Sequence, residues 1–458
     1  MNSILFNIFF TFFFCGLLLA QNDDVRVVGD KLTGKVINGE NVRIVDGNVV
    51  ITQQDVRITC DKAIQYFTQK KIELIDNVVI TQDSVKIETE KAFYFSDSKY
   101  AFTETFLTLQ KGNSNLEADR GEYFTEEELA IFYGNVSLVD TSTNLKSQKL
   151  YYYSEIEKII AIRDVNVFDD SSSLFADSLI YYRNSKFTNA FKNVSILDIA
   201  NRLTIFGEEF LSEGDSNKTI ITGSPFLFQV DSSDSGRKDT LFIKAERFET
   251  SEIPDSRLVA TDSVKIIRGL FSSVSNSAVL FRDDDIIEIN RLEKDVDPPV
   301  LWHDNSQLVG DSIKIYLKSN SLDYVDIRKD AFILSRSKEY PERYDQISGK
   351  KIIINFDSSK IKRTDVTEDV LSIYFTYDEG EPNGLIKSSA ERTILDFKEN
   401  QVVKVRMYGD PISEYHPENL IEGIELEFSL PSFFIYSNRP NKELFIELLN
   451  ERKTKTAK

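Results

Sequence analysis

The sequence predicts an all-β protein built from stacked copies of one small antiparallel unit. Three observations support this: an internal repeat, a two-residue alternation inside each repeat, and the lack of a long helical pattern between the alternating segments. Residues 47–53 (GNVVITQ) and 76–82 (DNVVITQ) match at six positions and begin 29 residues apart. An internal repeat of this length is typical of folds that stack one unit on the next.

Each repeat has the alternation of a half-buried strand. Val56, Ile58 and Cys60 alternate with polar residues, as do the apolar residues of segment 85–89. One face of such a strand is apolar and the other faces water. Turn residues separate these segments, so we expect roughly four short antiparallel strands in each unit. Weaker copies follow at 134–138, 164–167 and 193–196.

Composition narrows the classes of function. The chain has 458 residues, of which 41% are hydrophobic and 28% charged, so it can bury a core. Its 19 tyrosines and 33 phenylalanines suit a sheet protein. The net charge of −19 argues against a nucleic-acid partner, because phosphate contacts need clustered lysine and arginine. We interpret the acidity as a solvated sheet face.

The first residues have the pattern of a signal peptide. An apolar run extends from Ile4 to Leu19 and is followed by the small residue Ala20. The run is short for a membrane span, so residues 1–20 are predicted to be a cleaved signal peptide, with a retained anchor as the alternative. The mature chain would then keep Cys60 as its single thiol and form no intrachain disulfide.

No catalytic or metal-binding constellation is evident in the sequence. His303 and His416 are the only histidines, which leaves little for a zinc site or a histidine-activated nucleophile. The acidic run at 283–285 lacks the spaced ligands and the glycine of a calcium loop. We therefore predict no enzymatic activity, no cofactor and no metal.

Proline usage divides the chain. All ten prolines follow residue 224, and proline is excluded from central strands because it cannot donate to the ladder. This predicts a regular repeat region over 21–224 and a less regular continuation over 225–440. Leu444, Phe445, Leu448 and Leu449 have helical spacing, which predicts a short helix and basic tail over 441–458, capping the last strands.

An aliphatic stripe remains as the candidate binding surface. Its residues alternate within the repeats and should share one face of the sheet. Two interpretations stay open: two facing sheets fill this space with each other's side chains, or the sheets separate and the stripe lines an apolar groove that binds lipid. The stripe consists of Val49, Ile51, Val56, Ile58, Val78, Ile80, Val85, Ile87, Val136, Leu138, Val165, Val167, Val194 and Ile196.

The repeat resembles that of the OstA/LptA proteins of lipopolysaccharide transport. The resemblance rests on residues 47–51 followed by 56–63, and on segments 86–94, 116–123 and 174–181, two of which keep an Ala-Asp pair. It implies an elongated antiparallel β-jellyroll of two facing twisted sheets. It also implies lipopolysaccharide as a partner in the interior, and end-to-end assembly with other jellyroll components of the export machinery by β-augmentation at the end strands.

The expected function is therefore periplasmic lipopolysaccharide transport, with acyl chains shielded in an apolar groove between the inner and outer membranes, and with an association with the outer membrane. Two alternatives remain from the residues alone. One is a non-catalytic structural or adhesive extracellular β-repeat protein with a filled core. The other is a secreted carbohydrate-active enzyme on a β-helix, which would have parallel strands.

Overall fold

The structure, a computed structural model, describes residues 26–456 except for short gaps at 54–55, 83, 141–143, 215–217, 233–237, 252–255, 319–320, 358–359 and 399–400. The predicted signal peptide lies outside the described residues. The chain divides into two compact units, which we describe separately. Unit 1 comprises Met1–Ala200 and Gly207–Lys218, and unit 2 comprises Asn201–Phe206 and Thr219–Lys458. The predicted boundary at residue 224 stays a prediction.

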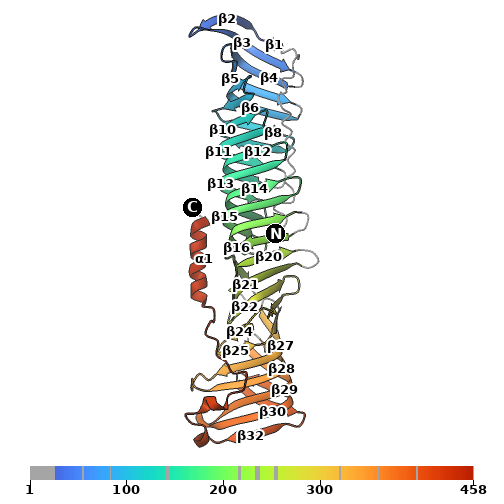
Figure 1. The fold of residues 1–458 in the computed structure, drawn as a ribbon, viewed down its shortest axis with the longest axis vertical. Coiled ribbons are helices and arrows are strands. Elements are labelled where there is room, and N and C mark those ends of the chain that lie inside the picture. The colour runs from blue at the N-terminus through green and yellow to red at the C-terminus, as the bar shows by residue number, and fades with distance from the viewer. Residues whose placement is uncertain are drawn as a thin grey trace. The chain divides into compact units, whose positions relative to one another are not determined.

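Unit 1 is formed by strands alone in its described part (Figure 1). Every strand pairing described within it is antiparallel, which confirms the predicted fold class. Its strands are β1 (Arg26–Val28), β2 (Lys31–Ile37), β3 (Glu40–Gln53), β4 (Val56–Tyr66), β5 (Lys71–Gln82), β6 (Val85–Phe95), β7 (Tyr100–Thr103), β8 (Leu107–Lys111), β9 (Ser114–Ala118), β10 (Arg120–Phe124), β11 (Leu129–Val139), β12 (Asn144–Tyr153), β13 (Lys158–Phe168), β14 (Ser172–Tyr182), β15 (Phe187–Asp198) and part of β16 (Leu203–Glu213).

Most of these strands are long and bend once near the middle. In β5 the bend is at Asp76 and Asn77, which both have positive φ, and the pairing with β6 shifts register there. The two halves of the strand thus belong to two walls that face each other. We call the wall that contains residues 71–75 the first wall and the wall that contains residues 78–82 the second wall. A repeat therefore holds two bent strands, where the sequence suggested four short ones.

The bends explain the repeated Gly-Asn and Ala-Asp motifs. Asn77 Nδ2 donates a hydrogen bond of 2.8 Å to Asp61 Oδ2 on the neighbouring strand. The same bond recurs 58 residues later between Asn135 and Asp119 at 3.0 Å. Asparagine tolerates the left-handed backbone better than most residues with a side chain. Each motif pair therefore fastens two adjacent strands at the bend and has a structural role.

Replacing Asn77 by alanine should lower the free energy of unfolding by about 1–2 kcal/mol. The change removes a hydrogen bond, and it leaves at positive φ a side chain with no polar group that could bond locally. Asn77→Gly removes the same bond but fits the backbone, so it should cost less than the alanine variant. Urea unfolding followed by circular dichroism measures both. Equal stability of Asn77→Ala and the parent protein would contradict the assigned role.

The turns between the bent strands also repeat with a period of 29 residues. Lys70, Lys99, Glu128, Glu157 and Lys186 occupy corresponding turn positions with positive φ. The backbone carbonyls of the first four accept hydrogen bonds from the N–H groups of the next turn along the chain, at 3.0 Å each. Each turn thereby fixes its neighbour, so the spacing visible in the sequence is also the spacing of the stacked units.

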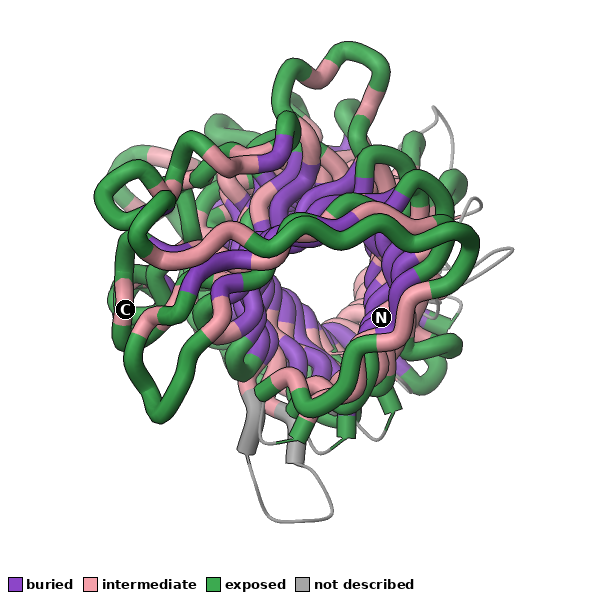
Figure 2. The backbone as a smooth tube through the Cα atoms, turned by 90° about the horizontal axis from the view of Figure 1, so that it is seen from below, coloured by how far each residue is buried: buried purple, intermediate pink, exposed green. Residues whose placement is uncertain are grey.

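Unit 2 continues with antiparallel pairing and ends in a helix. Its remaining elements are β17 (Lys218–Thr222), β18 (Phe226–Ser232), β19 (Lys238–Lys244), β20 (Arg247–Ser251), β21 (Arg257–Arg268), β22 (Phe271–Phe281), β23 (Ile286–Asn290), β24 (Val300–His303), β25 (Ser306–Val309), β26 (Ser312–Lys318), β27 (Ser321–Arg336), β28 (Tyr344–Asp357), β29 (Lys360–Asp378), β30 (Glu381–Lys398), β31 (Gln401–Tyr408), β32 (Ile412–His416), the 3-10 helices η1 (Glu418–Leu420) and η2 (Glu425–Phe428), and the helix α1 (Lys442–Thr456). Seen from below, the backbone of the strands curves around the interior (Figure 2).

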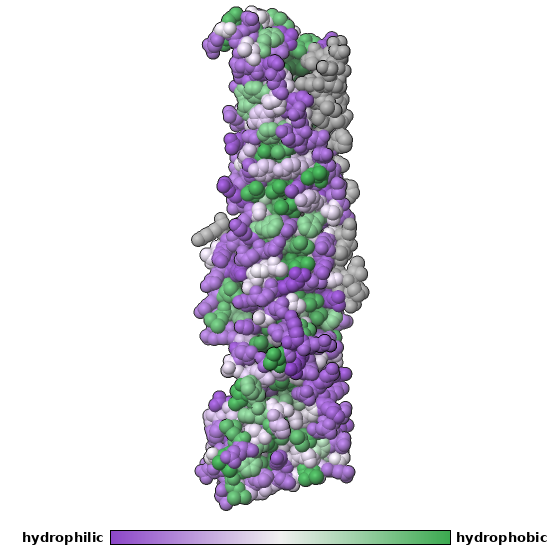
Figure 3. Space-filling view, in the orientation of Figure 1, coloured by the Kyte–Doolittle hydropathy of each residue, from purple (hydrophilic) through white to green (hydrophobic). Residues whose placement is uncertain are grey.

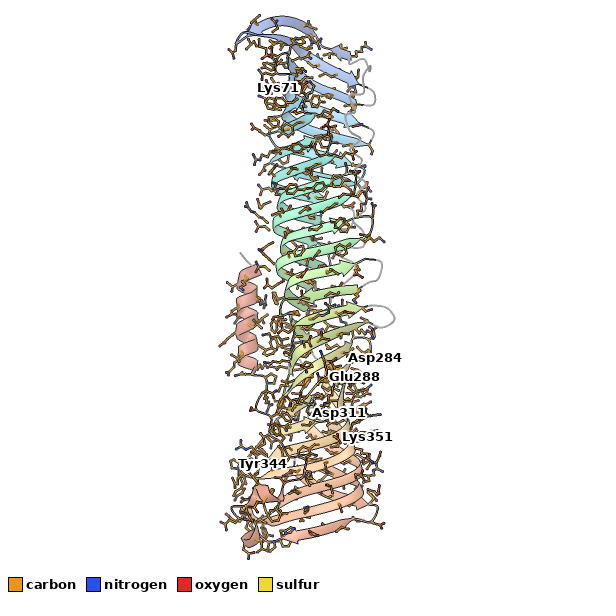
Figure 4. All side chains as sticks on the ribbon, viewed as in Figure 1. Lys71, Asp284, Glu288, Asp311, Tyr344 and Lys351 are labelled. Carbon is orange, nitrogen blue, oxygen red and sulfur yellow. The ribbon has the colours of Figure 1, made fainter. Side chains whose placement is uncertain are left out.

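A C-terminal strap, residues 417–441, covers one outer face of unit 2. Ile421 and Leu430 of the strap are fully buried against Trp302, Phe332 and Phe375 of the sheet. Tyr344 on β28, labelled in Figure 4, makes an edge-to-face ring contact with Phe433 of the strap, with centroids 5.7 Å apart. The strap therefore supplies the second side of a packed layer outside the sheet.

Polar side chains of the sheet bind the strap's backbone. Gln307 Nε2 donates to the carbonyl of Phe434 at 2.7 Å, and Gln307 Oε1 accepts the N–H of Tyr436 at 2.9 Å. Gln346 Oε1 accepts the N–H of Leu430 at 2.9 Å. Arg343, only 3% exposed, forms an ion pair with Glu418 of η1. These bonds fix the register of the strap.

Helix α1 packs on the first strands of unit 2. Phe445 makes edge-to-face contacts with Phe226 of β18 and Phe242 of β19, at centroid distances of 5.8 and 6.0 Å. Leu449 joins the same buried cluster. The helix was predicted correctly, but the expectation that it caps the last strands is wrong, because the strap carries it back to this patch. No helix in the described part of the chain is long and apolar enough to cross a membrane.

Candidate functional site

The predicted aliphatic stripe lies on the inner face of the second wall of unit 1. Ile51 pairs with Ile58, Ile58 with Ile80, and Ile80 with Ile87 in adjacent strands. The pairing continues without a break to β15. The complete row is Ile51, Ile58, Ile80, Ile87, Leu109, Leu116, Leu138, Leu145, Val167, Leu174 and Ile196.

The other stripe residues flank this row on the same face. All seven are buried: Val49, Val56, Val78, Val85, Val136, Val165 and Val194. Sequence reasoning missed four members of the row itself, Leu109, Leu116, Leu145 and Leu174. Leu116 and Leu174 stood inside the quoted motif segments and could have been included by alternation alone. Whether the stripe binds a ligand stays a prediction.

The first wall supplies the opposite side of the interior with residues that the sequence analysis did not nominate. One row alternates tyrosine with smaller residues: Tyr94 pairs with Ala101, Ala101 with Tyr123, Tyr123 with Ala130 and Ala130 with Tyr152. A neighbouring row includes Ala63, Leu74 and Ala92. The small residues leave room between the two walls.

An apolar cavity of about 130 Å³ lies between the walls of unit 1. The second wall contributes Val56, Ile80, Val85 and Ile87, four of the predicted residues, and also Leu107 and Leu109. The first wall contributes Ala92, Ala101, Gly121, Tyr123, Ala130 and Phe132. The cavity therefore combines the predicted stripe with a wall that the stripe did not reveal.

The interior of unit 2 contains fully buried aliphatic side chains and a contact between two aromatic rings. Ile313, Ile327 and Ile352 of three paired strands have no exposed surface. The ring of His303 on β24 meets that of Phe356 on β28 with centroids 5.1 Å apart. His303 therefore serves as a packed interior residue, and this contact narrows the interior of unit 2.

Asp345 of β28 is an ionisable group in unit 2 with a shifted pKa. Its Oδ1 accepts the backbone N–H of Phe375 at 2.9 Å. Burial raises the pKa of Asp345 to about 7, against the smaller opposing effect of this hydrogen bond. Cys60, the one free thiol described, is also buried, and burial raises its pKa, as expected of a small core residue.

Within the described residues, no group of three or more histidine, cysteine, aspartate or glutamate side chains could hold a metal ion. The chemistry that the interior offers is burial of hydrocarbon, with phenol hydroxyls along the first wall. These features define a repetitive antiparallel β-jellyroll with an apolar interior between two walls. The antiparallel pairing excludes the expected alternative of a parallel β-helix in the described strands.

Comparison with known proteins finds a family match in the N-terminal third of the chain. Residues 23–167 match the family model described as OstA-like protein, which confirms the resemblance seen in the repeats. The match contains the whole cavity and the greater part of the aliphatic row. Comparison with curated proteins found no match.

Among solved structures, the chain is similar to LptH of Pseudomonas aeruginosa, whose title describes it as the LptA-homologous periplasmic component of the lipopolysaccharide transport device. The two share 14% sequence identity, and the similarity covers 31% of this chain and 82% of LptH with a TM-score of 0.16.

Proposed function

We propose that this protein carries lipopolysaccharide through the periplasm by holding its acyl chains between the two walls of unit 1, without catalysing a reaction. The observation that supports this most is the unbroken aliphatic row facing a cavity inside the OstA-like segment. Bringing an acyl chain into water costs about 0.8 kcal/mol per methylene, or roughly 10 kcal/mol for a chain. An interior of this kind offsets most of that cost while the sugar head stays in water.

The free edges of the end strands suit assembly with similar jellyrolls. In the described part of the chain, β31 and β32 pair with β30, and β1 and β2 pair with β3. Ile412 and Val403 expose more than half of their surface at one of these ends, where apolar residues are visible in Figure 3. We propose that other jellyroll components of the export machinery add strands at these edges.

A structural β-repeat protein with a filled core is the second candidate, because the His303–Phe356 contact closes part of unit 2. Depleting the protein in cells separates the two. A transport role predicts that newly made lipopolysaccharide fails to reach the cell surface, as measured by surface labelling. Normal surface delivery after depletion would reject the transport role.

A further inference from the structure

Four tyrosines recur at the same position of successive repeats and share one register row. Tyr94, Tyr123, Tyr152 and Tyr181 are each 29 residues apart, and all lie on the inner face of the first wall of unit 1. Alanine or isoleucine separates consecutive tyrosines in the row. One strand therefore lies between one tyrosine and the next, and two strand spacings give a distance of about 10 Å.

The hydroxyls of these tyrosines are buried in the interior. Tyr123, Tyr152 and Tyr181 are 7%, 3% and 3% exposed. The hydroxyl of Tyr94 is buried and has no hydrogen-bond partner among the described residues. Tyr123 lines the cavity. A buried hydroxyl without a partner costs free energy, and phenylalanine would fill the same volume at no such cost.

The row also lies close to the polar edge of the wall. The charges of Glu157, Arg183 and Glu128 act on Tyr152, and those of Arg183 and Glu157 act on Tyr181. Burial raises the pKa values of Tyr94, Tyr152 and Tyr181, so these phenols stay protonated and can donate hydrogen bonds at neutral pH. The row thus lies between the apolar stripe and the charged turns.

We propose that this tyrosine row is a binding rail for the polar junction of a glycolipid, where ester and amide carbonyls and hydroxyls join the acyl chains to the sugar. The inference rests on the proposed function and adds which groups of the lipid are recognised and where. Each phenol donates a hydrogen bond to one such group, and the next tyrosine offers the same bond about 10 Å further along. The lipid can therefore pass from one repeat to the next and form the same hydrogen bond with each tyrosine in turn.

A double variant, Tyr94→Phe with Tyr123→Phe, tests the rail while keeping both rings. The matched control is Tyr100→Phe with Tyr153→Phe, on the opposite, outer face of the same wall. The probes are purified lipopolysaccharide and the apolar dye N-phenyl-1-naphthylamine, which has no carbonyl or hydroxyl. We expect the double variant to bind lipopolysaccharide about tenfold more weakly, to bind the dye as the parent does, and the control to match the parent with both probes.

Equal binding of lipopolysaccharide by parent and double variant would overturn the rail and leave the proposed function standing. A parallel loss of dye binding would show that the tyrosines serve packing, which also overturns it. If the parent protein binds the dye but not lipopolysaccharide, the proposed function and the rail both fail.

Discussion

Replacing Ala101 by tryptophan is expected to weaken lipopolysaccharide binding by at least about tenfold, because the indole would occupy space that two or more methylenes of an acyl chain use. Ala101 lines the cavity of about 130 Å³ in unit 1. It lies between Tyr94 and Tyr123 in the register row, so a large side chain there projects toward the second wall. A fluorescence titration with purified lipopolysaccharide measures the effect.

Gln110→Trp is the matched control. Gln110 is an exposed residue on β8, next to the interior residue Leu109. The substitution therefore adds the same indole ring on the outside of the wall. The control should bind as the parent does, and circular dichroism should show that both variants keep their strands. A folded Ala101→Trp protein with undiminished binding would show that this cavity is not where the lipid lies.

Replacing Asp345 by asparagine is expected to stabilise unit 2 at pH 8 by about 2 kcal/mol. The pKa of Asp345 is raised to about 7, whereas an unfolded aspartate titrates near 3.9. The folded state therefore holds a proton that the unfolded state releases between about pH 4 and pH 7, and stability falls as pH rises through that window. The full shift corresponds to about 4 kcal/mol, and contact of the half-buried Asp345 with water lowers this to about 2 kcal/mol.

Trp302 provides the measurement, since it is the single tryptophan of the chain and is 5% exposed in unit 2. Urea unfolding is followed by the fluorescence of Trp302 at pH 5 and at pH 8. The free energy of unfolding should fall less between these two pH values in Asp345→Asn than in the parent protein. Asparagine can still accept the Phe375 N–H through its side-chain oxygen. Asp410→Asn, at an exposed loop position, should follow the parent, and identical pH profiles for all three proteins would contradict a buried, protonated Asp345.

The fold of unit 1 could be predicted because two periodic patterns, one short and one long, are superimposed in its sequence. Alternation marks strands with one wet face, and the 29-residue spacing marks the stacked units. The bends were mistaken for strand ends, because Asp76-Asn77 reads as a turn. Two left-handed residues in a row redirect a strand between two walls without reversing the chain.

The strap and its outer layer could not be inferred from alternation. Residues 226–228 (FLF) and 300–302 (VLW) are consecutive apolar residues, and both faces of these strands are buried. Such runs are typical of strands covered on two sides, which was the available signal. It indicates a covering layer but does not say which segment provides it.

The tyrosine row and the small residues of the first wall were missed for a different reason. The aliphatic alternation marks the second wall, whereas the tyrosine content by itself indicates only a preference for sheet. The 29-residue spacing from Tyr94 to Tyr181 was visible in the sequence, but which tyrosines face the interior depends on the register across each bend.

The most direct measurement is photo-crosslinking in cells from single sites on the inner and outer faces of the second wall. Ile87 of β6 lines the cavity, whereas its neighbour Lys86 lies on the outer face and pairs with Glu88 at 2.6 Å. Ile58 lies in the same inner row as Ile87. A crosslinker at Ile58 or at Ile87 should capture lipopolysaccharide, and one at Lys86 should not. Equal capture at all three positions, or capture at Lys86 alone, would contradict transport through the interior.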